Sequence, residues 1–379
     1  MAEKLEKMEP RIRFQGFTDP WEQRKLGEFG SVEMCRRIYR HQTAEKGDVP
    51  FYKIGTFGAK PDAFISNSLF EKYRRQYPFP SIGALLISAA GSIGRIVEYQ
   101  GESAYYQDSN IVWLDHNDKL VDKFLKAFYE RTEWTLEGST IKRLYNKDII
   151  NTKIVIPSVQ EQEQVGTLFS SIDNLITLHQ RKLDTLKKLK KTLLSKLFPK
   201  NEEKSPELRF SGFTDDWEQR KLGDLFQQRT EKASGDEDLL SVTIADGVIR
   251  QKDSDKRNVS SDDKSNYKIV RKGDLAYNSM RMWQGAVGES DFFGIVSPAY
   301  TVLRPLNDLD TKFFMELFKK KTSLDIFRRW SQGLTSDTWN LKFPVLSKIT
   351  FRVTKSSEQS KIGEFLSSLD HLITLHQRK

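Results

Sequence analysis

A long helical segment occurs twice in this sequence, and it constrains the fold more than any other feature. Residues 161–198 read EQEQVGTLFSSIDNLITLHQRKLDTLKKLKKTLLSKLF, and the first part returns from residue 358 as EQSKIGEFLSSLDHLITLHQRK. Apolar residues recur in the first copy at alternating steps of three and four, which is typical of a coiled-coil seam. A helix of that length would be roughly 55 Å long, so its apolar stripe needs a partner helix. We predict that the two copies pack together, most simply as an antiparallel coiled coil, although an intermolecular pairing stays open.

The predicted seam is defined by the apolar and histidine positions of this period. It contains Val165, Leu168, Ile172, Leu175, His179, Leu183 and Leu186 in the first copy, and Ile362, Leu369, Leu372 and His376 in the second. The two histidines are at the same position of the repeat, where a polar residue that fixes the register is favoured over catalysis. The lysines near the end of the first copy are more often solvated than bound to phosphate.

A second block repeats with nearly the same period. Residues 12–27 read IRFQGFTDPWEQRKLG and residues 208–223 read LRFSGFTDDWEQRKLG, an offset of 208 minus 12, or 196. The helix repeats with an offset of 358 minus 161, or 197, whereas the sequence between the two blocks does not repeat. So long a period indicates a duplicated domain rather than a solenoid, and it favours pseudo-two-fold symmetry.

The segments between the blocks predict a mixed α/β (α+β) fold in both halves. Short apolar runs bounded by Gly and Ser predict strands at 84–88, 93–97, 110–114 and 152–157, with a helix over 118–137. The second half follows the same order, with strands in 267–280, 294–303 and 348–353 and a helix over 311–330. We therefore expect a domain at 1–157, a long helix at 158–198, a linker at 199–207, a second domain at 208–355 and a second helix at 356–379.

Composition narrows the setting of the protein. The 379 residues carry a formal charge of +9, and the isoelectric point is near 9.2, which suits a polyanionic partner without proving one. A single cysteine, Cys35, excludes an internal disulfide framework, and a structural zinc site would need more cysteines and clustered histidines. The sequence has neither a secretory apolar region at its start nor a run of eighteen apolar residues. We expect an intracellular, cytoplasmic protein without a membrane segment.

Catalytic motifs are missing from the sequence. It contains no phosphate-binding loop of the GxxxxGK[ST] type, no HExxH cluster and no Pro-Pro-aromatic tetrapeptide of amino-methyltransferases. The GSIGR segment at 91–95 lacks dinucleotide-site spacing and is better explained as a turn before a strand. We expect no active site and no metal site in this chain.

Cations, amides and aromatic residues gather instead in the predicted loops of both halves. Such side chains contact phosphates and read base edges. The candidate DNA-binding residues of the first half are Lys60, Arg74, Arg75, Tyr105, Tyr106, Gln107, Asn110, Lys142 and Arg143. Those of the second half are Asn278, Ser279, Arg281, Trp283, Gln284, Arg328, Arg329, Ser336, Asp337 and Thr338. Each alone is more often a solvated surface residue, but the loops at 138–143 and 333–338 occupy the same place in the two halves.

The whole layout resembles the specificity subunit of type I restriction-modification enzymes. The similarity covers nearly the entire chain, and the motifs that carry it are FTDPWEQRKLG with FTDDWEQRKLG, LISAAGSIGRIV with QDSNIVWL, YNSMRMWQGAVG with GIVSPAYTVLRP, and the two LITLHQRK helices. The resemblance implies a non-catalytic DNA reader. Each variable segment would be a target recognition domain for one half of an asymmetric bipartite site, and the coiled coil would set the spacing of the half-sites.

The resemblance also implies partners. These are double-stranded DNA, modification (methyltransferase) subunits, two in number, that bind S-adenosylmethionine and methylate adenine, and restriction subunits that use ATP and Mg²⁺ for translocation and cleavage. No cofactor is then expected in this chain. The alternative is a coiled-coil scaffold that organises proteins without sequence-specific DNA contact, and binding to a bipartite duplex over a scrambled one separates the two. An autonomous nuclease or methyltransferase is disfavoured by the missing motifs.

The two helical copies differ in length. Lys379 aligns with Lys182, so about sixteen residues of the first copy have no counterpart in this sequence. Part of the seam between Leu183 and Leu197 would then be unpaired, and related short forms can self-associate. We expect weaker packing of the coil than in a relative with two full-length helices.

Overall fold

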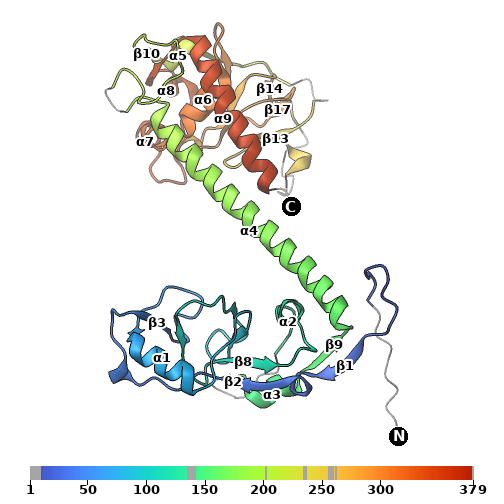
Figure 1. The fold of residues 1–379 in the computed structure, drawn as a ribbon. Helices are drawn as coiled ribbons and strands as arrows, with labels where there is room; N and C mark the ends of the chain where they lie inside the picture. Colours follow the sequence, from blue (N-terminus) through green and yellow to red (C-terminus); the bar gives the residue numbers. More distant parts are fainter. Residues whose placement is uncertain are drawn as a thin grey trace. The chain divides into compact units, whose positions relative to one another are not determined.

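The computed structural model describes residues 10–134, 142–200, 203–233, 237–254, 260 and 263–377. It consists of two compact units, residues 1–177 and 178–379. Each unit is a mixed α/β domain in which short strands alternate with short helices (Figure 1). No helix among the described residues is long and apolar enough to span a membrane.

The first unit is built around a four-stranded sheet with the order β2-β8-β5-β6. A three-stranded sheet, β4-β3-β7, and the two-stranded β1-β9 complete it. The strands are β1 Glu22–Lys25, β2 Gly30–Glu33, β3 Val49–Tyr52, β4 Phe64–Ile65, β5 Leu85–Ser88, β6 Ile96–Glu98, β7 Tyr105–Tyr106, β8 Ile111–His116 and β9 Lys153–Ile156, and the helices are α1 Asn67–Gln76, α2 Asp122–Tyr129, α3 Asn146–Asn151 and α4 Val159–Lys196, which continues into the second unit.

The second unit repeats this plan. Its four-stranded sheet has the order β11-β18-β15-β16, which matches β2-β8-β5-β6 strand for strand. The strands are β10 Glu218–Lys221, β11 Phe226–Gln228, β12 Leu240–Thr243, β13 Gly247–Arg250, β14 Lys268–Val270, β15 Leu275–Asn278, β16 Val287–Glu289, β17 Gly294–Val296, β18 Tyr300–Pro305 and β19 Thr350–Val353, and the helices are α5 Leu222–Leu225, α6 Thr311–Lys319, α7 Lys321–Trp330, α8 Phe343–Leu346 and α9 Ser356–Gln377.

The predicted strands are present in both units, whereas two predicted helices differ in length. The helix expected over 118–137 is limited to α2, Asp122–Tyr129, in the described part of that range. The helix expected over 311–330 is divided into α6 and α7, because Lys320 between them has an extended backbone. Apolar spacing continues through the break, so the pattern alone could not locate it.

The repeated EQRK segments close each unit by pairing with its last strand. Residues 22–25 pair antiparallel with residues 153–156, and residues 218–221 pair in the same way with residues 350–353. In each unit, therefore, the repeated start of the domain is held beside the strand that leads into the long helix.

The repeated Glu-Gln pair anchors the start of each long helix. Glu161 accepts two hydrogen bonds of 2.8 Å from the Arg13 guanidinium, and Glu358 accepts bonds of 2.7 and 2.9 Å from Arg209. Both carboxylates are completely buried, so each needs its bidentate arginine partner. The sequence alone did not indicate this pairing, because each arginine lies 148 or 149 residues away from its glutamate.

The two halves of α4 belong to different hydrophobic cores. In its first half, Gly166 lies so close to α2 that a Cβ atom would come within 2.8 Å of the Phe124 backbone nitrogen. In its second half, Leu193, Leu197 and Phe198 belong to the core of the second unit. The boundary between units therefore falls at 177/178, inside the helix that the sequence presented as a separate element.

The antiparallel pairing of the long helices is confirmed for the second half of α4. His179 faces His376 with 3.2 Å between their Nδ1 atoms, and Lys190 further along α4 reaches Asp370, which is earlier in α9. The two histidines are equivalent positions of the repeat, so the local two-fold axis of the helix pair passes between them. Leu183 is buried, and Leu186 packs on the core of the second unit.

The predicted seam is only partly present elsewhere. Ile362 and Leu369 are buried in the hydrophobic cluster that also contains Leu193, so their place beside the second half of α4 agrees with the prediction. Val165 packs instead on the core of the first unit. Leu168, Ile172, Leu175 and Leu372 are all more than two-fifths exposed. Within the described part of the first unit, α2 approaches α4 at Gly166, whereas Leu168, Ile172 and Leu175 stay exposed.

Candidate nucleic-acid interface

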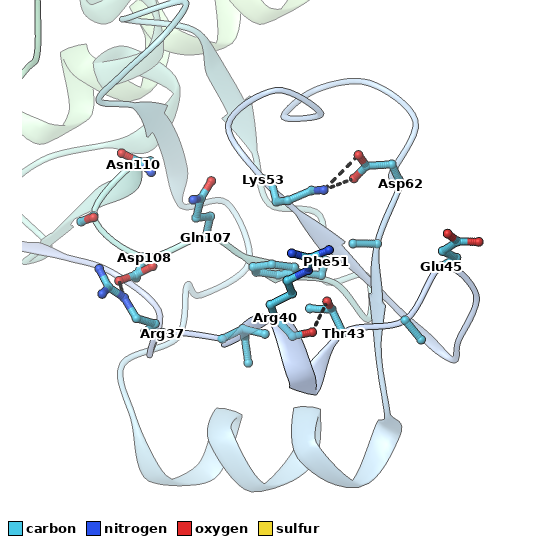
Figure 2. Close-up of a pocket in the computed structure, with 14 residues that line it drawn as sticks. Arg37, Arg40, Thr43, Glu45, Phe51, Lys53, Asp62, Gln107, Asp108 and Asn110 are labelled. Atoms are coloured by element: carbon cyan, nitrogen blue, oxygen red, sulfur yellow. Dashed lines mark hydrogen bonds and ion pairs between the residues drawn. The ribbon is translucent and has the colours of Figure 1, made fainter. Parts of the chain in front are cut away.

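The first unit has a polar hollow of about 610 Å³ beyond one end of its four-stranded sheet (Figure 2). Four segments form its wall: the chain after β2, the strand β3 with the residue that follows it, the chain before β4, and the turn between β7 and β8. Its lining residues include Arg37, Arg40, Thr43, Glu45, Phe51, Lys53, Asp62, Gln107, Asp108, Ser109 and Asn110. This mixture of cations and amides has the chemistry needed to contact phosphates and base edges.

Two of the cations in this hollow are paired with carboxylates. The Arg37 Nε atom lies 2.7 Å from Asp108 Oδ2, and this bond raises the pKa of the arginine. The Lys53 Nζ atom lies 2.9 Å from Asp62 Oδ1. Both pairs are partly exposed, so solvent screens them and a phosphate could compete for the cations. Arg40 has no side-chain partner among the described residues and can bind an anion directly.

The two amide side chains of the hollow have fixed orientations. The Gln107 Oε1 atom accepts a bond of 2.8 Å from the Ile54 backbone nitrogen, and the Asn110 Oδ1 atom accepts a bond of 3.2 Å from Arg143. Because an N–H group donates in each bond, the oxygen must be the bonded atom, and neither amide is free to flip. Each NH₂ group is left to donate elsewhere.

The turn that carries Asn110 has an unusual backbone. Ser109 has a φ of 53°, one of two non-glycine residues with positive φ among those described. Arg143 donates a bond of 2.8 Å to the Ser109 carbonyl oxygen as well as its bond to Asn110. Non-glycine residues in the left-handed region are costly and concentrate at functional sites, so this turn is a candidate site on backbone grounds alone.

Two predicted DNA contacts of the first unit are wrong. Tyr105 and Tyr106 are almost completely buried, and their hydroxyl groups donate to the Arg36 carbonyl oxygen and to Glu102. Burial raises the pKa of both phenols. These tyrosines form the short strand β7 beside β3, and because they are buried they cannot reach a base. The prediction failed because aromatic composition does not distinguish a core strand from a loop. The buried Cys35 thiol lies in the same core, where burial raises its pKa to about 12.

The remaining predicted cations lie outside the hollow. Arg74 and Arg75 are on α1, where Arg74 covers the rings of Phe70 and Phe79. Lys60 is exposed in the chain between β3 and β4, and Lys142 is exposed where the description resumes. Most of the loop at 138–143 lies outside the described residues. The structure therefore brings together Gln107, Asn110 and Arg143 among the predicted set.

Sequence analysis missed the cations on either side of β3. Arg37, Arg40 and Lys53 line the hollow. For the two arginines, the run CRRIYRH at 35–41 was the available signal, since it is basic and precedes a strand. The ion pair between Asp108 and Arg37 was also missed. A carboxylate beside expected phosphate ligands indicates a binding site only when the arginine that pairs with it is known.

The second unit has a hollow of about 660 Å³ beyond the matching end of its sheet. Asn110 directly precedes β8, and Tyr300 begins the equivalent strand β18. The lining of the second hollow includes Thr243, Asp246, Gln251, Asp253, Ser254, Asn278, Arg281 and Tyr300. Its carboxylates, Asp246 and Asp253, have no cation partner among the described residues, whereas two carboxylates of the first hollow are paired.

Predicted residues of the second unit are divided between this hollow and its surroundings. Asn278 and Arg281 line the hollow, and the Asn278 Oδ1 atom accepts a bond of 3.0 Å from the Met280 backbone nitrogen. Arg281 donates to Gln284 at 3.1 Å. Ser279 is largely buried and donates to the Ala299 carbonyl oxygen, so the prediction that it contacts DNA is wrong.

The other predicted residues of this unit are Trp283, in the turn between β15 and β16, and residues on α7 or in the chain that follows it. The Trp283 ring packs edge-on against Trp339, with 5.3 Å between centroids. Arg328 and Arg329 are exposed in the last turn of α7. The exposed loop at 333–338 holds the last three, Ser336, Asp337 and Thr338, and a hydrogen bond with Thr335 lowers the pKa of Asp337. No group of three metal-ligating side chains occurs among the described residues.

Comparison with known proteins gives a consistent result. A family model described as the type I restriction modification DNA specificity domain matches residues 18–188 and again residues 214–379. A putative type I restriction enzyme specificity subunit of Haemophilus influenzae is 51% identical over 158 residues, which are 40% of this chain and 41% of that protein. The type I restriction enzyme MjaVIII specificity subunit of Methanocaldococcus jannaschii is 24% identical over 294 residues, which are 71% of this chain and 65% of that protein.

These matches cover less than two thirds of either curated relative's length. The crystal structure of a type I restriction-modification system S subunit from M. genitalium shares the fold, with a TM-score of 0.62 and 16% identity. That likeness covers 98% of this chain and 94% of the other.

Proposed function

This chain belongs to the type I restriction modification DNA specificity family, and from that premise we propose that it reads a bipartite DNA site. Each unit binds one half-site, and the long helices set the distance between them. The two half-sites have unrelated sequences, because the units share a scaffold and differ in the side chains that reach DNA.

One observation carries this proposal. The two hollows lie beyond the same end of equivalent sheets, yet their linings differ in charge and in hydrogen-bonding groups. The first has three cations, three carboxylates and two oriented amides, and the second has one arginine, two amides and two carboxylates that have no cation partner among the described residues. Equivalent placement with unlike chemistry is what an asymmetric target requires.

We assign the chemical steps of restriction and modification to other subunits. Two modification subunits bind S-adenosylmethionine and methylate adenine, and restriction subunits use ATP and Mg²⁺, so this chain itself needs no cofactor and is not an enzyme. The exposed apolar stripe on the first half of α4, which includes Leu168, Ile172 and Leu175, supports the existence of a protein partner.

Binding measurements test the proposal against a scaffold role. The full chain should bind a duplex with both half-sites at the correct spacing more tightly than a duplex with one half-site scrambled. Affinity for both duplexes should fall with salt, because phosphate contacts release counterions. A scaffold without sequence-specific contacts would bind both duplexes equally at every salt concentration.

Domain exchange gives an independent test. Replacing residues 28–157 with the same segment of another family member should change one half of the recognised site and leave the other half unaltered. Methylation mapping in a host that carries the exchanged chain would show the new site directly. A change in both half-sites, or in neither, would contradict the assignment of one half-site to each unit.

A further inference from the structure

The turn at residues 108–110 is held by a residue from a distant part of the first unit. Arg143 donates to the Ser109 carbonyl oxygen at 2.8 Å and to Asn110 Oδ1 at 3.2 Å, so one guanidinium holds both the strained backbone and the adjacent amide. Arg143 is only partly exposed, and the acceptors of both bonds belong to this turn of the protein itself. This arrangement differs from that of a cation that extends towards a phosphate.

We propose that Arg143 is a positioning residue, and that through it Asn110 determines the base accepted at one position of the first half-site. The inference rests on the proposed function and assigns a role within it. The Asn110 oxygen accepts a hydrogen bond from Arg143, so the NH₂ group of Asn110 is the donor presented to DNA. It donates to an acceptor on a base edge, and guanine is the base with two adjacent major-groove acceptors, O6 and N7.

The neighbouring amide supports this assignment. Gln107 lines the same hollow, and its oxygen is held by the Ile54 backbone N–H group at 2.8 Å. Two amides therefore present NH₂ donors in one hollow (Figure 2). The carboxylates Asp108 and Asp62 are occupied by Arg37 and Lys53, which limits the acceptors available to a base that presents a donor.

The second unit lacks this arrangement. The Leu144 backbone nitrogen donates to Ala89, and the Leu341 nitrogen donates to Ser279 at the equivalent point of the sheet, so Asn340 occupies the place of Arg143. Asn340 exchanges backbone bonds with Gln332 and donates its side-chain amide to the same residue. Positioning by an arginine is thus found at this place in the first unit and not in the second. Base preference in the second half-site therefore serves as an internal control.

The first experiment measures base preference with the full chain and duplexes randomised in both half-sites. Asn110→Asp replaces the NH₂ donor by an acceptor in the same space. We expect one position of the first half-site to lose its preference for guanine by about tenfold relative to bases that present a donor. Replacing that guanine by 7-deazaguanine should weaken wild-type binding and leave the variant unaffected.

The second experiment removes the positioning residue. Arg143→Ala should relax the preference at the same position, because both bonds come from the Arg143 Nη2 atom and alanine supplies no donor. Arg143→Lys keeps one nitrogen with several N–H donors, so it should retain more of the preference than alanine does. The slope of affinity against salt should not change. If Arg143 instead contacted a phosphate, its loss would weaken binding to all sequences equally and reduce that slope by about one, which would overturn the proposal.

A matched control comes from the same hollow. Arg40→Ala removes a cation that has no side-chain partner among the described residues and holds neither amide, so it should weaken binding uniformly without changing base preference. Thermal melts identify any variant that fails to fold, and Asn110→Asp tests the same position without disturbing the arginine. If the wild-type chain discriminates both half-sites while neither variant alters the first, the inference fails and the proposed function stands. If no chain discriminates half-sites, the proposed function itself fails.

Discussion

The repeated helix has two very different environments in the two units. Leu366 of α9 and Phe169 of α4 occupy the same place in the repeat, yet Leu366 is fully buried and Phe169 is 42% exposed. The next position of the stripe behaves in the same way, since Leu369 is 6% exposed and Ile172 is 41% exposed. Nearly identical apolar patterns therefore have unequal burial.

The difference arises from one additional layer of side chains. In the second unit, Leu193, Leu197 and Phe198 at the end of α4 share a hydrophobic cluster with Leu366 and Leu369. In the first unit, the described residues include no such helix end. Apolar periodicity thus specifies which face of a helix is to be covered, and the covering segment determines whether burial stabilises the fold.

An ion-pair cluster strengthens the covered face and gives the largest expected effect. Lys190 lies 3.0 Å from Glu316 and 2.6 Å from Asp370, and Glu316 is almost completely buried. Lys190→Met would leave Glu316 without its cation, so we expect the unfolding free energy of the second unit to fall by about 3–5 kcal/mol near neutral pH. Denaturant titration with a probe in that unit measures the loss.

The pH dependence of this variant tests the cause. Burial raises the pKa of Glu316 and Lys190 opposes that rise, so removing the lysine raises the pKa further. A carboxyl group with a raised pKa in the folded state contributes stability below its unfolded pKa and loses it as pH rises through the folded value. The penalty should therefore be smaller at about pH 5 than near neutrality. Lys187→Met, at an exposed position, is the control and should change stability by less than about 0.5 kcal/mol.

Truncation of equivalent residues gives the next largest effect. Leu366→Ala creates a cavity in the packed core and should cost about 2–4 kcal/mol. Phe169→Ala removes a half-exposed side chain from the same place in the repeat and should cost less than about 1 kcal/mol. Separate unfolding transitions of the two units would show both values. Equal costs would mean that Phe169 is covered in solution by another protein or by a segment outside the described residues.

Sequence reasoning predicted the scaffold of this molecule better than its binding surface. The duplicated blocks, the sheet strands and the long helices follow from local sequence patterns, and the structure contains a strand or helix at each predicted place. Arg13 with Glu161 and Arg209 with Glu358 were not predicted, because bidentate pairs between distant segments leave no periodic signal.

The exposure of the candidate binding residues could not be predicted from their type. Gln107 and Asn110 line the hollow, whereas the tyrosines at 105 and 106, immediately before them in the sequence, are in the core. Strand β7 has only two residues, too few to show an alternation that would mark them as buried. The positioning contact of Arg143 depends on a left-handed serine, which no composition rule anticipates.

The smallest effect is expected from extending α9. The antiparallel register with His179 opposite His376 would carry residues appended after Lys379 along the open stripe of α4. Appending the sequence of residues 183–198 should cover Phe169 and Ile172 and provide a lysine for Asp173, the counterpart of Asp370. Because both apolar side chains are already about half buried, we expect a gain of about 1 kcal/mol and a melting temperature a few degrees higher.

Two controls make this extension specific. Aspartate in place of the two leucines equivalent to Leu193 and Leu197 should abolish the gain, and Asp173→Asn should reduce it while leaving the unextended chain unchanged. Identical melts of the extended and unextended chains would show that covering the open face of α4 does not stabilise the protein, in contrast to the covered face of α9. A concentration-dependent dimer of the unextended chain that loses its self-association on extension would instead identify a second copy as the native cover of Phe169 and Ile172.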